Sequence, residues 1–348
     1  MLWELVGGAA VACALSLAVC RVLIAAGPVD LADEDHKSHT RPTPTSGGVG
    51  IAVGYTAALV ALIQMEGELG LVRQVAALVW LASVFAFVFL LIGFVDDTRR
   101  LGPRLKFLSF ALLSIGVAIT MGVVDVLPLG EGAAWRLGLS LGLFGTALWV
   151  FTMVNGVNFM DGANGLAMGS MAIGLLGLGA IAFSGGANSA AAISFCAAGG
   201  IVGFLVWNFP NGRIFAGDSG ALFAGAVAAI ASLIILARTD VSPFVPPILF
   251  FPLLADALLT LAWRVVRKRS ILVGHQEHLY QIAIRTGWSH AQISLTYWAL
   301  MALCGVLGFS LARSGHGAWP WMALLALAVA AIAASVLVRR FAKAKGLN

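Results

Sequence analysis

Residues 149–171, WVFTMVNGVNFMDGANGLAMGSM, place a short polar break between two long apolar runs, and this pattern decides the fold. The break, 155–166, carries three asparagines and one aspartate at every third position: Asn155, Asn158, Asp161 and Asn164. Side chains spaced in this way can converge on one ligand, whether the break coils as a loop or as a helical turn. A plain turn between two membrane helices explains the same residues, so the choice depends on the rest of the chain.

The composition is that of an integral membrane protein. Of the 348 residues, 60% are hydrophobic and only 11% are charged, whereas ordinary soluble proteins have about 25% charged residues. A helix needs about 20 apolar residues to cross the hydrocarbon core. We therefore predict an all-α fold with about eleven transmembrane helices, near 3–26, 47–65, 74–94, 106–126, 137–154, 166–184, 190–207, 219–237, 247–263, 291–312 and 321–338.

The positive charges predict the orientation of these helices, because short cytoplasmic loops are rich in lysine and arginine. One set of connections holds 16 of the 21 basic residues, and the opposite set holds four. The basic set is 27–46, 95–106, 155–165, 208–218, 264–290 and the tail 339–348. We expect these segments in the cytoplasm, the N-terminus in the periplasm and the C-terminus in the cytoplasm. Residues 1–338 then form a single transmembrane domain. The net charge of +5 is explained by the basic cytoplasmic side of a membrane protein, so we expect no nucleic-acid partner.

An acidic pair ends the third predicted span, in GFVDDTRRLGPRLKF. Asp96 and Asp97 are followed within ten residues by Arg99, Arg100, Arg104 and Lys106. Paired carboxylates beside basic residues suit a divalent cation that carries a diphosphate. Charges that only set the topology would explain the arginines, but not two adjacent acids.

Two further aspartates border or enter the predicted spans. Asp218 begins an apolar run, at a helix N-terminus that favours the negative charge of a carboxylate or a bound phosphate, although a simple capping role explains it too. Asp256 lies inside a predicted span, where an acid either serves function or bonds to a neighbouring helix. We favour the structural bond for Asp256.

The two longest cytoplasmic loops carry the remaining candidates. Loop 27–46 holds a basic run, and Gly47 and Gly48 after it are expected to expose backbone N–H groups suited to an anion. Loop 264–290 places His275 and His278 on either side of Glu277. Without a third adjacent ligand, phosphate binding or acid–base work is favoured over a zinc site, and histidines without a role remain the alternative.

These candidates all fall at the predicted cytoplasmic ends of spans: Asp96, Asp97, Lys106, Asn158, Asp161, Asp218 and His275. One water-facing site of acids, amides and bases suits metal-assisted phosphoryl transfer between a soluble nucleotide and a lipid phosphate. The alternative is a secondary transporter of a polar or anionic substrate, whose site would lie near the middle of the bilayer.

The motifs resemble the polyprenyl-phosphate N-acetylhexosamine-1-phosphate transferases, the glycosyltransferase family 4 superfamily of the MraY and WecA enzymes. The resemblance covers spans one to ten, through KSHTRPTPTSGG, GFVDDTRR, NGVNFMDGANGLA, NFPNGRIFAGDSGALFAG, PLLADALLTLAWR and GHQEHLYQ. It implies transfer of a sugar 1-phosphate from a UDP-N-acetylhexosamine to undecaprenyl phosphate, with release of UMP. It also implies Mg²⁺, with Mn²⁺ as an alternative, and a bacterial inner-membrane enzyme with a cytoplasmic active site. A homodimer is compatible with it.

The resemblance also implies roles for the residues that match the family's motifs. It implies that Asp96, Asp97, Asp218 and His275 are catalytic and that Asn158, Asp161 and Asp218 are metal ligands. The residues assigned to substrate binding are Lys37, His39, Arg41, Arg100, Lys106, Asn155, Asn164 and His278. Two departures are Arg100, where the family has lysine, and HQEH in place of consecutive histidines. The second favours the WbpL-like branch, which initiates O-antigen or related surface glycans; the sugar, the pathway, the catalytic base and a direct or two-step route stay open.

Overall fold

The computed structural model describes residues 2–26, 29–30, 43–64, 73–270, 274–314 and 317–346. Lys37, His39 and Arg41, which we assigned to substrate binding, lie outside the described residues. The helices are α1 (Leu2–Ala26), α2 (Gly47–Gln64), α3 (Arg73–Arg99), α4 (Pro103–Met121), α5 (Gly138–Met160), α6 (Leu166–Ser184), α7 (Asn188–Asn208), α8 (Gly217–Arg238), α9 (Val245–Leu249), α10 (Phe251–Val266), α11 (Leu279–Arg285), α12 (His290–Ala312) and α13 (Trp319–Ala344). Two antiparallel strand pairs complete the described structure: β1 (Val29–Asp30) with β2 (Thr43–Pro44), and β3 (Val126–Gly130) with β4 (Ala133–Arg136).

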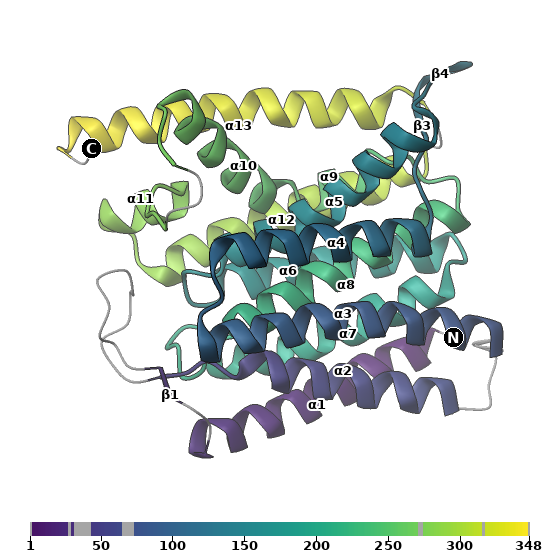
Figure 1. Ribbon diagram of the computed structural model, residues 1–348, viewed down its shortest axis with the longest axis horizontal. Coiled ribbons are helices and arrows are strands. Elements are labelled where there is room, and N and C mark those ends of the chain that lie inside the picture. Colours follow the sequence, from purple (N-terminus) through teal and green to yellow (C-terminus); the bar gives the residue numbers. More distant parts are fainter. Residues whose placement is uncertain are drawn as a thin grey trace.

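Ten helices within the described ranges are long and apolar enough to cross a membrane, which confirms the predicted all-α integral membrane fold. The predicted ninth span, 247–263, is divided into α9 and α10, which meet at Phe250. Prolines interrupt this segment because they lack the N–H that a helix needs: Pro246 and Pro247 open α9, and Pro252 opens α10. The two termini lie at opposite ends of the helix bundle (Figure 1), although the side of the membrane on which each lies stays a prediction.

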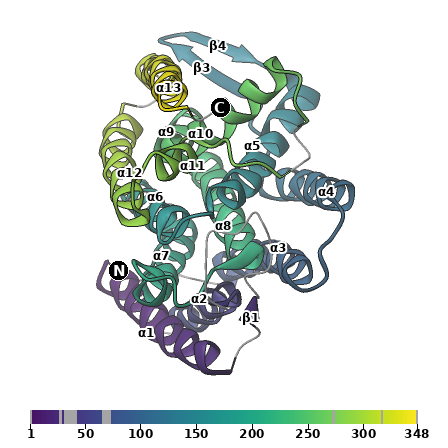
Figure 2. The ribbon, with the colours of Figure 1, turned by 90° about the vertical axis from the view of Figure 1, so that its left-hand side faces the viewer.

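Helix α8 forms the centre of the bundle. It is almost entirely buried and packs against α2, α3, α5, α6 and α7. Viewed from the end that carries α11, these helices surround α8, whereas α13 lies at the periphery (Figure 2). Residues 339–344 of the predicted tail 339–348 form the last part of α13.

The sequence of α8 explains its central place, because it is rich in glycine, alanine and serine. Small residues let helix backbones approach closely, and van der Waals packing of this kind drives helix association in membranes. A Cβ atom added at Gly225 of α8 would lie 2.9 Å from the carbonyl oxygen of Met153 and 2.9 Å from the Cα of Val154 in α5. Glycine is therefore required at this crossing.

Backbone hydrogen bonds join the start of α2 to the segment that leads into α8. The N–H of Gly47 donates to the carbonyl of Phe215 at 2.9 Å, and that of Gly48 donates to Ala216 at 3.0 Å. Our expectation that these two N–H groups face an anion is therefore wrong. The short β2 strand continues the contact, since Phe215 N donates to Pro44 O at 2.8 Å.

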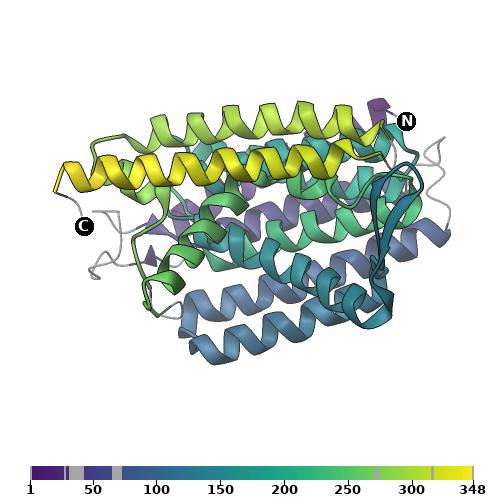
Figure 3. The same cartoon turned by 90° about the horizontal axis from the view of Figure 1, so that it is seen from above.

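The hairpin of β3 and β4 lies at the opposite end of the bundle from the C-terminus (Figure 3). The indole N–H of Trp321, in α13, donates to the carbonyl of Leu129 in β3 at 2.7 Å. This bond anchors the peripheral helix at its first turn.

The packing of α8 on α5 predicts different effects on stability for two glycine-to-alanine substitutions. Gly225→Ala should destabilise the protein by ~1–3 kcal/mol, the usual cost of overpacking, because its Cβ meets backbone atoms that cannot move aside. Gly145→Ala in α5 meets nothing within 4 Å and should leave stability unchanged or raise it, since alanine is the better helix former. Thermal unfolding in one detergent compares the two, and equal midpoints would contradict the close crossing.

Candidate active site

A cleft of about 560 Å³ opens at the end of the bundle where α3 ends and α8 begins. Segments far apart in the sequence line it together. The predicted site residues in its lining are Asp96, Asp97, Arg100, Lys106, Asn158, Asp161, Asn164 and Asp218. The acids of the third span, of the central polar break and of α8 thus face one cavity, as a single site requires.

Lys106, on the first turns of α4, lies between two carboxylates. Its ammonium forms an ion pair with Asp96 and lies 3.0 Å from Oδ2 of Asp218. The second oxygen of Asp96 accepts the N–H of Leu101 at 2.7 Å, which orients the carboxylate. Because these side chains are partly buried, their charges interact more strongly than a pair fully exposed to water. Lys106 therefore compensates two like charges and holds them beside the cleft.

Asp97 has different partners from its neighbour Asp96. Its two oxygens accept the backbone N–H groups of Asp218 at 2.8 Å and Ser219 at 3.1 Å, at the start of α8. Gly217 just before them has a φ of +70°, and a Cβ there would lie 2.6 Å from Asp97 Oδ2. A negative charge is favourable at a helix N-terminus. Asp97 thus fixes the first turn of α8 and, with it, the position of Asp218.

Asp161 follows the last residue of α5 and lines the cleft with Asn158. Within the described ranges no donor reaches its carboxylate. Burial raises the pKa of the Asp161 carboxyl to about 7, and the negative charges of Asp218 and Asp97 add to this effect. A partly buried acid that lacks donors and lies near two other acids favours a cation as its partner.

The donor set of the cleft suits a hard divalent cation. Carboxylate and amide oxygens are available, and these are the ligands of Mg²⁺ and Mn²⁺ in proteins. Within the part of the chain that the structure describes, no group of three or more His, Cys, Asp or Glu side chains is placed to hold a metal ion by itself. Mg²⁺ sites commonly use one or two carboxylates and complete their shell with water and substrate phosphates. The residues present therefore fit this ion.

The central polar break divides into cleft-facing and structural positions. Asn164 lines the cleft and also donates from Nδ2 to the carbonyl of Pro210 at 2.9 Å. Asn208 supports the same turn, since its Oδ1 accepts the N–H of Gly165 at 2.6 Å. Asn155, which we assigned to substrate binding, is not in the lining and donates to Phe151 O one turn back at 2.8 Å.

The two predicted histidines lie outside the cleft lining. Their rings stack on each other with centroids 5.0 Å apart, and His278 is only 3% exposed, with Nδ1 3.6 Å from Oδ1 of Asp256. Burial is the main cause that lowers the pKa of His275 to about 4, so its imidazole is neutral at pH 7 and a weak base. The structure therefore does not place the histidines in the lining of the cleft that holds Asp96, Asp97, Asp161 and Asp218.

Other residues of the same segment reach the cleft instead, and we missed them. Gln276, Gln281 and Arg285 are in its lining. Gln281 and Arg285 are four residues apart on α11, so they share one helix face. This spacing, in the amphipathic stretch after His278, was the signal that could have identified Gln281 and Arg285.

Asp256 is also outside the cleft lining. It accepts the hydroxyl of Tyr297, on the neighbouring helix α12, at 2.6 Å. This is the structural bond between helices that we favoured for a carboxylate inside a span.

The chain is similar in sequence to known proteins. Residues 77–236 match the model of glycosyl transferase family 4. The chain is 30% identical over 288 residues to a probable undecaprenyl-phosphate N-acetylglucosaminyl 1-phosphate transferase of Bacillus subtilis. This alignment covers 81% of this chain and 76% of the relative. It is 31% identical over 281 residues to the phospho-N-acetylmuramoyl-pentapeptide-transferase of Moorella thermoacetica, covering 76% and 83% of the two chains.

A third relative is the decaprenyl-phosphate N-acetylglucosaminephosphotransferase of Mycobacterium leprae, 30% identical over 305 residues, covering 79% of this chain and 74% of the relative. These alignments span most of both chains in each case. The chain therefore belongs to glycosyl transferase family 4, in the superfamily of the polyprenyl-phosphate N-acetylhexosamine-1-phosphate transferases.

Proposed function

We propose that this protein transfers an N-acetylhexosamine 1-phosphate from a UDP-sugar to undecaprenyl phosphate and releases UMP. The observation that carries the proposal is the charge cluster in the cleft, where Lys106 lies between Asp96 and Asp218 and Asp161 faces the same space. The cluster lies at one end of the bundle, where a soluble nucleotide and the phosphate of a membrane lipid can meet. The proposed location is the cytoplasmic face of a bacterial inner membrane.

The residues that would hold Mg²⁺ are Asp218 with Asn158 or Asp161. The ion would neutralise the oxygens of the donor diphosphate and make its phosphorus more electrophilic. Asp218 needs a fixed position for this role, and the bonds from the first α8 amides to Asp97 supply it. Lys106 and Arg100 line the cleft as cations that can offset the charge of the departing UMP.

The acceptor phosphate is already an anionic nucleophile, so the proposed reaction needs little assistance from a general base. A phosphate oxygen of undecaprenyl phosphate attacks the phosphorus that bears the sugar, and the bond from that phosphorus to the bridging oxygen breaks, so UMP leaves with the electron pair. Both oxygens of Asp97 are held by the α8 amides, and those of Asp96 are held by Lys106 and the N–H of Leu101. We therefore assign the positioning of the acceptor phosphate to the acidic pair as a whole. The altered HQEH motif supports a role in starting O-antigen or another surface glycan.

A UMP-release assay separates transfer from transport, the alternative from the sequence. Membranes containing the protein, supplied with undecaprenyl phosphate and Mg²⁺, should release UMP from at least one of a panel of UDP-N-acetylhexosamines. Release should stop when the lipid is omitted or the ion is chelated, because both take part in the reaction. Uptake of the sugar nucleotide without UMP would favour a transporter and would contradict the proposal.

Asp218→Asn should lower the rate of UMP release by ~10²–10³ or more, the usual effect of losing one electrostatic contact to the reacting groups. The substitution keeps the size of the side chain, so the melting temperature in detergent should stay close to that of the unsubstituted protein. Asp240→Asn is the matched control, because Asp240 is exposed and lines a different cavity, beside the β3–β4 hairpin. Near-normal turnover of Asp218→Asn would remove this residue from the active site.

Lys106→Met should lower kcat/KM by ~10²-fold, since Asp96 and Asp218 would then face each other and the substrate phosphates without their cation. Arg104→Met removes a basic side chain from the same helix, but Arg104 is exposed and outside the cleft lining, so its activity should be unchanged. Steady-state kinetics of both variants make the comparison. Equal losses would show that general surface charge, rather than the ion pairs of Lys106, supports the reaction.

A further inference from the structure

The carboxylate of Asp256 holds four hydrogen bonds although it is only 2% exposed and lies outside the cleft. Oδ1 accepts the N–H of Leu279 at 2.7 Å and the hydroxyl of Thr260 at 3.2 Å. Oδ2 accepts the hydroxyl of Tyr297 at 2.6 Å and the N–H of Tyr280 at 3.1 Å. Four donors fill the four acceptor positions that an ionised carboxylate offers. Two of these donors are the first backbone amides of α11.

Helix α11 depends on such contacts for its placement. It has seven residues, and an isolated helix of this length is unstable in water. Gln281 supports its start, because Oε1 accepts the N–H of His278 at 3.1 Å. The bonds to Asp256 fix the first turn at two consecutive amides, so they set how the helix is rotated. That rotation decides whether Gln281 and Arg285 face the cleft.

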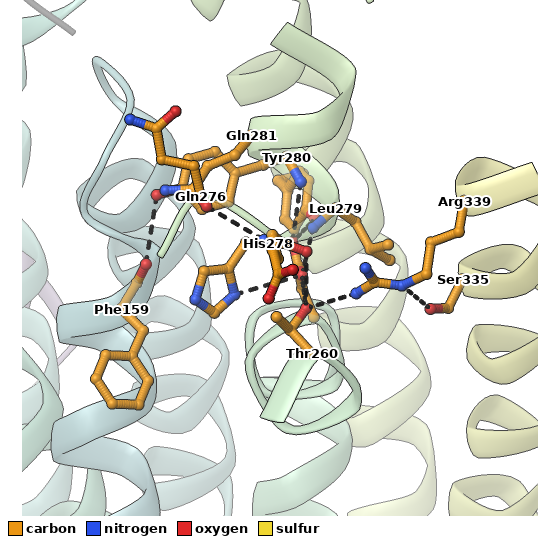
Figure 4. A network of polar contacts seen from close by, with 12 residues as sticks. Phe159, Thr260, Gln276, His278, Leu279, Tyr280, Gln281, Ser335 and Arg339 are labelled. Atoms are coloured by element: carbon orange, nitrogen blue, oxygen red, sulfur yellow. Dashed lines mark hydrogen bonds and ion pairs between the residues drawn. The ribbon is translucent and has the colours of Figure 1, made fainter. Parts of the chain in front are cut away.

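Helix α13 supports the hydrogen bonds around Asp256 from the periphery of the bundle. Arg339, on α13, donates from Nη2 to the hydroxyl of Thr260 at 3.1 Å and from Nε to Ser335 at 3.4 Å (Figure 4). Its guanidinium also lies 4.9 Å from the ring centroid of Trp263. Thr260 can donate to Asp256 while it accepts from Arg339, because a hydroxyl has one donor and two acceptor positions. The peripheral C-terminal helix is thereby joined to the base of α11.

We propose that Asp256 is a positioning residue for the transfer reaction. Through the amides of Leu279 and Tyr280 it orients α11 and thus places Gln281 and Arg285 beside the sugar-nucleotide donor. The inference rests on the proposed function, in which the donor occupies this cleft. Displacement of a substrate-positioning group by about 1 Å can cost ~10²-fold in rate, so a group that orients the helix affects the reaction without touching the substrate.

Asp256→Asn tests the proposal because the amide keeps the shape but has one acceptor oxygen in place of two. One of the two donor pairs then faces an NH₂ group. We expect amide hydrogen exchange in 279–285 to speed up about tenfold, which corresponds to losing ~1.4 kcal/mol of hydrogen bonding to a charged group. We expect the KM for the UDP-sugar to rise about tenfold, and the KM for undecaprenyl phosphate to stay unchanged.

Tyr297→Phe provides a milder variant that keeps both backbone bonds of Asp256 and removes one side-chain donor. It should raise the same KM by a smaller factor, and it keeps the proposal testable if Asp256→Asn does not fold. Tyr55→Phe is the matched control, since Tyr55 is 1% exposed and its hydroxyl lies 2.9 Å from Ser83 in a different part of the bundle. It should leave both KM values unchanged.

A double-substitution cycle shows whether Asp256 acts through α11. The effects of Asp256→Asn and Arg285→Ala on the KM for the UDP-sugar should be less than additive, because the first already displaces the second residue. Unchanged exchange in 279–285, or faster exchange with both KM values unchanged, would overturn the positioning role. Those outcomes require an active unsubstituted protein, so they differ from failure of the proposed function, in which the unsubstituted protein releases no UMP from any donor.

Discussion

One contact fixes the geometry of the cleft: the carboxylate of Asp97 accepts the amides of Asp218 and Ser219, where α8 begins. The backbones of α3 and α8 must come very close for this to happen. A Cβ at Gly93 would lie 2.5 Å from the nitrogen of Ser219, so glycine allows the approach. The negative charge of Asp97 and the positive end of α8 favour each other. The most buried helix of the protein therefore begins at its candidate active site.

The acids in the cleft are compensated to different degrees, and this affects how the proposed substrates bind. Lys106 compensates Asp96 and Asp218, while Asp161 has no donor among the described residues. An excess of negative charge would repel a diphosphate on its own. In the proposed function a divalent cation reverses this repulsion, so the cation and the nucleotide should bind together. In that proposal the fixed carboxylates act by electrostatics and positioning.

The sequence predicted the membrane fold and the grouping of the acids well, because apolar run length and basic loops reflect strong physical constraints. It could not separate Asp96 from Asp97, since their different partners depend on how α8 packs 121 residues later in the chain. Pro246 and Pro252 were the sequence signal for the helix break at Phe250, but the continuous apolar composition of the segment suggested a single helix. His275 and His278 were assigned to the site because imidazole suits acid–base chemistry and phosphate binding. Their positions in the structure are instead determined by burial and ring stacking.

The distances along the chain also set the order in which charges meet during biogenesis. Asp96 pairs with Lys106 of the very next helix, so this pair can neutralise itself as soon as α3 and α4 leave the translocon together. Asp97 receives its amides only from α8, 121 residues further on. The nascent chain thus carries an acid without its final partners while α4, α5, α6 and α7 are inserted, and docking of α8 completes the group of acids in the cleft.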